Sequence, residues 1–134
     1  MNEQLVDFKT AKLAKKKGFN WKCNFYDKCI IIYEAQNIEY NRKKFGSYEN
    51  WNHRKYGTSF TSLPTQSQLQ KWLREEKNIS LLLEMVTNEV GYSWTSYRVN
   101  PEEEPNFYFR SDFVWYSYEE ALENGLYSIL KKLK

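Results

Sequence analysis

The chain has 134 residues, of which 41% are hydrophobic and 28% are charged, and its formal net charge is +3. This balance predicts one globular domain over residues 1–134 and excludes collagen-like and disordered chains. Two cysteines cannot form a disulfide framework, and no apolar run approaches the roughly 20 residues needed to span a bilayer. The opening MNEQLVDFKT lacks a signal-peptide pattern, so we expect a cytoplasmic protein that does not bind membranes.

Charge and aromatic content are distributed unusually along the chain. Residues 1–60 carry twelve Lys or Arg against six Asp or Glu, whereas residues 61–134 carry eight against eleven. The N-terminal half is therefore expected to attract anions. Aromatic residues make up 18% of the chain, as five Trp, eleven Tyr and eight Phe.

The first predicted element is a helix over residues 8–17. Asp7 is its expected N-cap, because a carboxylate can accept hydrogen bonds from the free N–H groups of the first turn. Gly18 suits the left-handed position after the last turn, from which Phe19 can fold back on Ala14.

Two short strands and a long loop are expected next. Residues 29–33 are apolar and rich in β-branched side chains, and residues 21–26 are their expected antiparallel partner across a turn at residues 27–28. Residues 36–62 contain six aromatic and five basic residues but only one aliphatic residue, Ile38. We interpret this segment as an aromatic and basic loop, too long for a passive connection.

Both later helices begin with a capping box. Thr65 and Gln68 start a helix that is expected to end near residues 77–78, and Ser117 starts the last helix in the same way. Gly125 lies inside that last helix, where glycine costs about 1 kcal/mol relative to alanine. It indicates either a close approach by another element or simple tolerance.

The strands between these helices complete the predicted fold. Residues 79–87 and 92–99 are expected to form a hairpin through a turn at residues 88–91. Residues 101–105 read as a solvated loop and residues 107–116 as a further aromatic strand. The element order predicts an α+β fold: a twisted, mainly antiparallel sheet of about five strands with three helices on one face.

Three helical segments carry a resemblance to a known family. They are Leu63-Pro64-Thr65-Gln66 with QKWLRE at residues 70–75, SYEEALENGL at residues 117–126, and AKLAKKKGF at residues 11–19. Over about a third of the chain, the sequence resembles small uncharacterised proteins from gut Bacteroidetes and their phages. The resemblance implies a phage or prophage setting, but that family has no assigned activity and no catalytic residues to transfer.

The sequence carries no recognisable signature of catalysis, metal binding or a cofactor. Cys23 and Cys29, with a single His in the chain, cannot supply the four ligands of a zinc site, so we expect reduced structural cysteines. His53 has no nucleophile or acid at a signature spacing and is expected to be a surface or ligand-contacting residue. The isolated glycines do not form a phosphate-binding loop.

The aromatic and basic residues indicate a binding site. Rings can stack on a base, and guanidinium groups can pair with phosphate oxygens. The predicted ligand-binding residues are Tyr48, Trp51, His53, Arg54, Tyr56, Trp94, Arg98 and Arg110. The alternative is that the rings fill a core poor in Leu and Val while the basic residues only solvate the loop.

These features favour a non-enzymatic protein that binds a nucleotide-like small molecule. In its sharpest form the hypothesis is a phage-type sponge, an anti-defence protein that sequesters a cyclic dinucleotide or an ADP-ribose derivative in the bacterial host cytoplasm. We expect a homo-oligomer, because a pocket between subunits lets a small fold enclose its ligand. The alternatives are an inhibitor module that binds a host protein and a single-stranded nucleic-acid binder. An enzyme ranks last.

Overall fold

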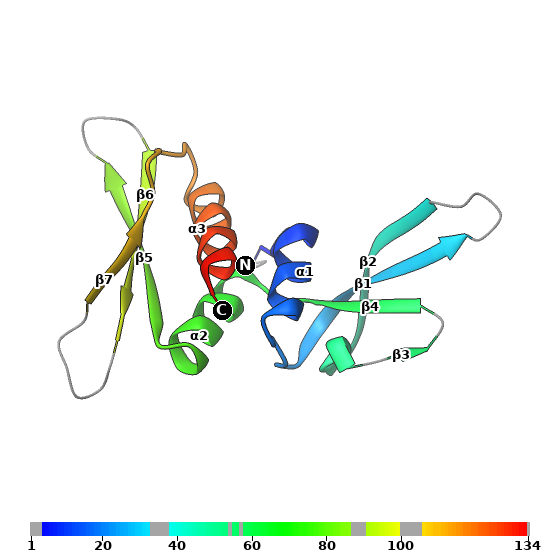
Figure 1. The fold of residues 1–134 in the computed structure, drawn as a ribbon. Coiled ribbons are helices and arrows are strands. Elements are labelled where there is room, and N and C mark those ends of the chain that lie inside the picture. The colour runs from blue at the N-terminus through cyan, green and yellow to red at the C-terminus, as the bar shows by residue number, and fades with distance from the viewer. Residues whose placement is uncertain are drawn as a thin grey trace. The chain divides into compact units, whose positions relative to one another are not determined.

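The computed structural model shows an α+β protein whose described residues fall into two compact units (Figure 1). It describes residues 4–32, 38–53, 55–56, 58–86, 91–99 and 106–133. The N-terminal unit comprises Leu5–Pro64, and the C-terminal unit comprises Thr65–Lys134 together with Met1–Gln4. Within the described residues, no helix has both the length and the apolar character needed to cross a membrane. That residues 1–134 form a single domain stays a prediction.

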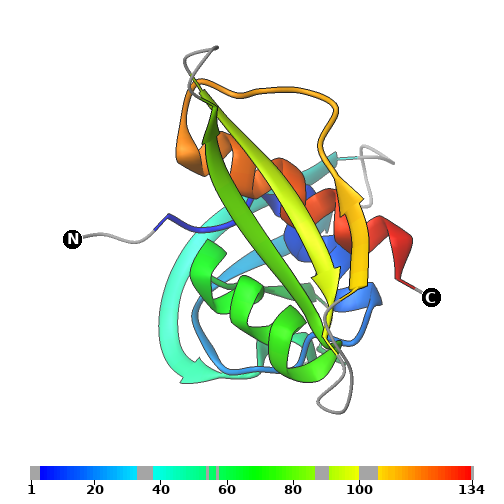
Figure 2. The same cartoon turned by 90° about the vertical axis from the view of Figure 1, so that its left-hand side faces the viewer.

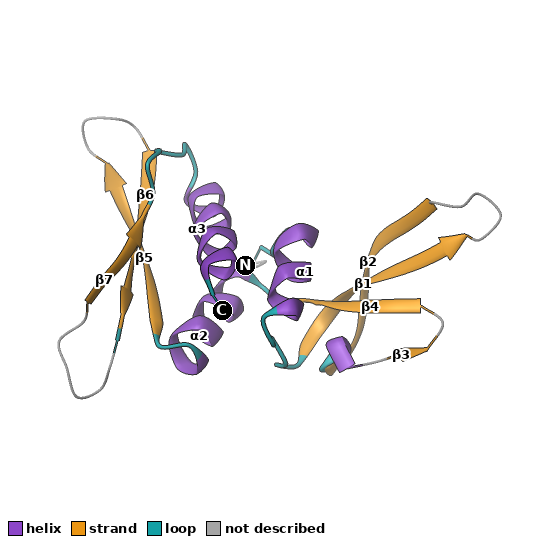
Figure 3. Cartoon of the chain, viewed as in Figure 1, coloured by secondary structure: helices purple, strands orange, loops and turns teal. Residues whose placement is uncertain are grey.

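The N-terminal unit is a four-stranded antiparallel sheet with one α-helix (Figure 3). Its strands follow the order β2-β1-β4-β3, so β1 and β4 are the central strands. Its elements are α1 (Phe8–Lys16), β1 (Cys23–Ile32), β2 (Ile38–Glu49), the 3-10 helix η2 (Trp51–His53), β3 (Lys55–Tyr56) and β4 (Thr58–Leu63).

Helix α1 begins after Asp7 and ends before Gly18, as its sequence predicts, but the capping contact at its start differs. Gly18 has φ +97°, and the Phe19 amide donates to the Ala14 carbonyl at 2.9 Å, so the chain reverses through a left-handed glycine. Asp7 occupies the N-cap position, but its side chain makes no capping hydrogen bond. The expected carboxylate cap is therefore wrong.

The predicted turn at residues 27–28 is also wrong, because β1 runs unbroken from Cys23 to Ile32. Asp27 pairs with Lys43 of β2 on one side and with Thr61 of β4 on the other. A central strand is held by backbone hydrogen bonds along both edges, and this pairing overrides the turn preference of Asp-Lys.

The expected loop at residues 36–62 is largely β structure, formed by β2, β3 and β4. Its aromatic side chains fill part of the core that aliphatic residues fill elsewhere. Trp51 is only 5% exposed, and its ring stacks on Tyr26 at 4.0 Å and lies 6.0 Å from Phe60. Gly46 makes this packing possible, because a Cβ there would come within 2.7 Å of the Trp51 ring. Polar and aromatic strand residues were misread because their pattern lacks aliphatic alternation.

The C-terminal unit is a three-stranded antiparallel sheet with two helices on one face (Figures 1 and 2). In Figure 2 the sheet lies in front of both helices. The strand order β5-β6-β7 follows the chain order. The elements are α2 (Gln66–Glu76), β5 (Ile79–Val86), β6 (Gly91–Arg98), β7 (Asn106–Arg110) and α3 (Tyr118–Lys132).

The local signals of this unit are confirmed at both helix starts. Thr65 Oγ1 accepts from the Gln68 amide, and Ser117 Oγ accepts from the Glu120 amide, each at 3.1 Å. The β5–β6 hairpin is also as predicted, whereas residues 88–90 of its turn and the whole predicted loop at residues 101–105 lie outside the described residues.

Gly125 marks a close approach between α3 and the sheet. A Cβ at this position would come within 3.0 Å of Trp94 Cγ and 3.1 Å of the Leu81 side chain. Trp94 and Leu81 are 3% and 2% exposed, so α3 lies directly on the buried face of β5 and β6.

Two strand predictions are corrected here. The expected strand at residues 107–116 ends at Arg110, because the chain bends at residues 112–113. Ser111 is still hydrogen-bonded to Trp94 of β6, and Trp115 forms an isolated bridge with Tyr92. The strands also form two sheets rather than one sheet of about five strands. Strand periodicity identifies which residues are extended, but it does not state which strands pair.

Candidate ligand-binding site

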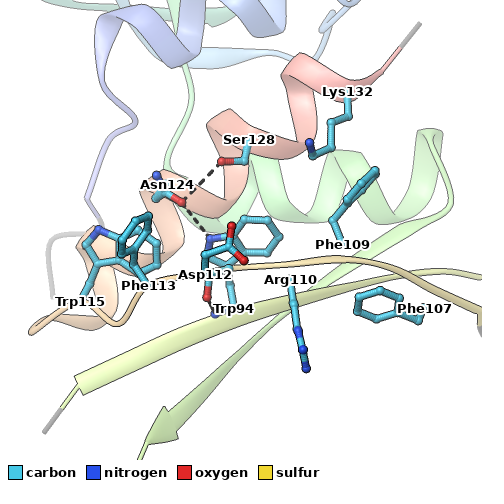
Figure 4. A pocket seen from close by; sticks show the side chains of 11 residues that line it. Trp94, Phe107, Phe109, Arg110, Asp112, Phe113, Trp115, Asn124, Ser128 and Lys132 are labelled. Carbon is cyan, nitrogen blue, oxygen red and sulfur yellow. Dashed lines mark hydrogen bonds between the residues drawn. The ribbon is translucent and has the colours of Figure 1, made fainter. Parts of the chain in front are cut away.

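A cavity of about 460 Å³ lies beside β7 in the C-terminal unit (Figure 4). Three parts of the unit line it: the sheet at β6 and β7, the connection of residues 111–115, and the inward side of α3. All its lining residues lie between Trp94 and Lys132, so the site is built within one unit.

Trp94 and α3 form the buried wall of this cavity. The Trp94 indole Nε1 donates to Asn124 Oδ1 at 2.9 Å, and Ser128 Oγ approaches the same oxygen at 3.4 Å. Because Gly125 has no side chain, α3 can approach the indole closely enough for this hydrogen bond. The indole is thus held by a polar partner and is not free to rotate.

Hydrogen bonds to β6 fix the connection that follows β7. The Ser111 amide donates to the Trp94 carbonyl at 2.9 Å, while Ser111 Oγ accepts from the Trp94 amide at 3.1 Å. Two residues further along β6, Ser96 Oγ donates to the Phe109 carbonyl at 2.8 Å and accepts from the Phe109 amide at 3.0 Å. Two serine hydroxyls therefore replace regular ladder bonds where the register shifts.

Aromatic rings form the open walls of the cavity. Phe107 is 59% exposed, Phe109 36% and Phe113 70%, and the Phe113 ring meets Trp115 edge to face at 6.4 Å. Rings of this size normally bury most of their surface, since water contact with apolar area is unfavourable. Several exposed rings around one hollow are typical of a surface that is covered by a ligand or a partner.

Charged groups stand at the rim. Lys132 extends from α3, and its Nζ lies 4.2 Å from the centre of the Phe109 ring. Asp112 supplies a carboxylate among the lining residues, and Arg110 extends away from α3 in Figure 4. Lys132 is therefore the cation on the α3 side of the cavity, where a negatively charged group of a ligand would meet it.

Three predicted site residues belong to this unit, and two of them line the cavity together. Trp94 and Arg110 are both lining residues. Arg98 lies outside the lining, with its guanidinium 4.5 Å above the Tyr108 ring. The two arginines occupy the neighbouring strands β6 and β7.

The other predicted residues belong to the N-terminal unit. Trp51 is a core residue: its ring face is covered by Tyr26, and its Nε1 donates to the Cys23 carbonyl at 2.9 Å. A ligand base therefore cannot stack on Trp51 without breaking the core, which is the alternative that the sequence left open. Tyr48 is 62% exposed, whereas His53 is exposed with Nδ1 2.5 Å from the Asn50 carbonyl oxygen. The predicted residues Arg54 and Tyr56 cannot be assessed, because Arg54 and the side chain of Tyr56 lie outside the described residues.

Several lining residues were missed by sequence reasoning. Phe109, Phe113 and Trp115 lie in the segment predicted as a strand, and Lys132 lies at the end of the last predicted helix, so none of them was a predicted site residue. The sequence did contain one sign of exposed rings, which is the high density of aromatic residues in 107–116. In a small sheet only one face of a strand packs on the core, so these rings cannot all be buried.

Other reactive groups do not form a site in the described part of the chain. Cys23 is 2% exposed, and burial raises the pKa of its thiol to about 12, so it stays protonated and unreactive at neutral pH. No cluster of three or more His, Cys, Asp or Glu side chains suited to a metal occurs among these residues.

No protein-family model, curated protein or solved structure matches the chain. The resemblance to a phage family therefore stays a prediction, and function has to be argued from the site.

Proposed function

We propose that this protein is a non-enzymatic binder of a nucleotide-like small molecule and that the cavity beside β7 is its binding site. The observation that carries the proposal is the combination of exposed aromatic rings with the Lys132 ammonium around one hollow. A cavity of about 460 Å³ falls in the range of roughly 300–1,000 Å³ typical of small-ligand sites.

Each group has a distinct expected role. Phe113 and Trp115 offer apolar surface on which a planar base can stack. Lys132 would pair with phosphate oxygens. Asp112 would accept a hydrogen bond from an exocyclic amine or a ribose hydroxyl, which distinguishes a nucleotide from a simple aromatic acid.

A cationic ligand fits this site less well. Rings attract cations through their faces, but Lys132 already places its ammonium 4.2 Å from the centre of Phe109. A second cation at that ring would be repelled by the first, so the arrangement favours a ligand with negative charge beside its planar part.

The resemblance to phage proteins extends the proposal to biology. A binder that holds a host nucleotide signal without converting it would act as a sponge in the host cytoplasm. The exposed Phe107 and Phe113 support the further expectation of a homo-oligomer, because a second copy could close the open side of the cavity.

A thermal-shift screen against cyclic dinucleotides, ADP-ribose isomers and adenine mononucleotides tests the proposal. A ligand present at 100 times its Kd should stabilise the folded chain by about 2.7 kcal/mol. Phe113→Ala should weaken binding at least fivefold, since one stack contributes about 1–3 kcal/mol. Tyr116→Ala is the matched control, because Tyr116 is 88% exposed in the same connection but does not line the cavity.

A second pair of variants tests the contribution of the Lys132 charge to nucleotide binding. Lys132→Gln should weaken nucleotide binding about tenfold, whereas Lys131→Gln removes the same charge from a residue outside the lining and should leave it unchanged. The bound nucleotide should be recovered intact after denaturation. A screen without any stabilising nucleotide would reject the proposal, and recovery of a converted product would reject the non-enzymatic part.

One observation favours a second candidate, a module that binds a host protein. Exposed rings continue beyond the cavity to Tyr116 and Tyr118, which are 88% and 43% exposed. In that case Tyr116→Ala and Phe113→Ala should both abolish capture of one specific protein, and no nucleotide should stabilise the chain.

A further inference from the structure

The two compact units differ more in net charge than residues 1–60 and 61–134 do. Leu5–Pro64 contains twelve Lys or Arg against five Asp or Glu, a formal charge of +7. Thr65–Lys134 with Met1–Gln4 contains eight against twelve, a formal charge of −4. The N-terminal unit is therefore strongly basic, and its positive charge has no role in the nucleotide site proposed for the C-terminal unit.

Helix α1 presents a face of lysines. Lys9, Lys12 and Lys16 are exposed, whereas Ala11 and Ala14 on the opposite side are fully buried. Their spacing of three and four residues places the three ammonium groups along one side, over about 10 Å of helix. Helix α1 (FKTAKLAKK) itself contains no acidic residue.

Strand β2, in the same unit, exposes two aromatic rings. Phe45 is 72% exposed and Tyr48 is 62% exposed. The Phe45 ring contacts Phe25 edge to face at 5.2 Å, so it is held in place while most of its surface faces water. β2 is an edge strand of its sheet, which leaves room for a ligand along its side.

We propose that the N-terminal unit binds single-stranded nucleic acid, with the α1 lysines on the phosphates and the β2 rings on unpaired bases. Basic side chains with stacking rings are the two components that sequence-independent single-strand binders combine. A unit of 60 residues has a radius of gyration of about 10 Å, so one oligonucleotide can reach both elements.

An anionic membrane is a poorer partner for the same charges. A surface helix that inserts into a bilayer needs an exposed apolar face, but the apolar side of α1, Ala11 and Ala14, is 0% exposed. A duplex is also less suitable, because its bases are stacked on each other and cannot lie on Phe45 or Tyr48.

Fluorescence anisotropy with a labelled 20-nucleotide oligo(dT), from 50 to 300 mM NaCl, tests this inference on the full chain. The triple variant Lys9→Gln, Lys12→Gln and Lys16→Gln should weaken binding at least tenfold at 50 mM NaCl. It should also lower the slope of log K against log salt by about 2, since each lost phosphate contact on a single strand contributes about 0.7.

The matched control removes the same charge elsewhere. Lys71→Gln, Lys77→Gln and Lys131→Gln change three exposed lysines of the acidic unit, and binding should change less than twofold. Phe45→Ala should weaken binding about fivefold or more, whereas Tyr116→Ala should not. Circular dichroism confirms that each variant stays folded.

Four results would overturn the inference. The first is that the chain does not bind oligo(dT) at 50 mM NaCl, and the second is that both triple lysine variants lose the same amount of oligo(dT) affinity. The third is that the chain binds a 20-base-pair duplex more tightly than oligo(dT). The fourth is that it binds phosphatidylserine vesicles through the α1 lysines but does not bind the oligonucleotide. The Lys9, Lys12 and Lys16 variant retains the whole cavity beside β7, so its nucleotide thermal shift reports separately on the proposed function.

Discussion

Asp27 is a buried carboxyl group in the middle of β1, and replacing it should stabilise the protein. It is only 5% exposed, and its Oδ1 is buried without a hydrogen-bond partner in the described part of the chain. Removal from water disfavours the charged form and raises the pKa of the Asp27 carboxyl above its usual value of 3.8. At neutral pH the fold therefore carries an ionic group that is better solvated when the chain is unfolded.

The expected effect of Asp27→Asn follows from this burial. An unsatisfied buried polar atom costs about 1–3 kcal/mol, and the neutral amide avoids the extra cost of desolvating a charge. We expect the free energy of unfolding to rise by about 1 kcal/mol or more at pH 7. For a unit of 60 residues, 1 kcal/mol corresponds to about 4–8 °C in Tm.

The pH dependence provides the sharper test. With a raised pKa in the folded state, the folded chain binds more protons than the unfolded chain between pH 3.8 and the folded pKa. The wild type should therefore be most stable relative to Asp27→Asn below pH 3.8. This relative stability should decline as pH rises to the folded pKa and stay constant above it.

Urea unfolding followed by circular dichroism between pH 3 and 8 measures both curves. Asp7→Asn is the control, because Asp7 is an exposed carboxylate of the same unit. The reasoning that the buried Asp27 carboxylate destabilises the fold would be refuted by either of two results. One is that the free energies of unfolding of wild type and Asp27→Asn change in parallel with pH, and the other is that Asp27→Asn is less stable than wild type at pH 7.

Three further predictions concern the core around Trp51. Trp51→Phe removes the indole N–H that donates to the Cys23 carbonyl, so the free energy of unfolding measured in urea should fall by about 1–3 kcal/mol. Nucleotide affinity should not change, and a loss of affinity without a loss of stability would contradict the core role of Trp51. Gly46→Ala places a Cβ 2.7 Å from the Trp51 ring and 2.9 Å from Tyr26, so Tm should fall through overpacking costing about 1–3 kcal/mol; an unchanged Tm would contradict this packing. In a Cys29→Ser background, Cys23 should resist iodoacetamide at pH 8 until guanidinium is added, because its pKa is about 12; rapid alkylation of the folded chain would oppose this.

Helix ends and strand segments could be predicted from the sequence wherever the interactions that form them join residues close together in the chain. Thr65, Ser117 and Gly18 each act within a few residues of the helix end that they define, so their chemistry is present in the sequence itself. The β5–β6 hairpin was readable for the same reason, because its partners are close in sequence. Gly125 left close packing and simple tolerance open, and only the fold showed that Trp94 and Leu81 lie against it.

Pairing and burial were decided by residues far apart in the chain. Asp27 looks like a turn residue until β2 and β4 flank it, and Trp51 looks like a ligand platform until Tyr26 covers it. The cavity beside β7 likewise depends on Ser111, Asn124 and Trp94, which meet only when α3 packs on β6.

The sequence by itself determined the α+β class, the three helices and their ends, and the supply of rings and cations, because these follow from composition and short-range hydrogen bonding. Only the tertiary structure decided that the strands form two sheets, which rings are buried, and where rings and cations gather. A side chain's free energy in water is the same at every position along an unfolded chain. Its burial depends on which distant backbone closes over it, and that is a property of the fold.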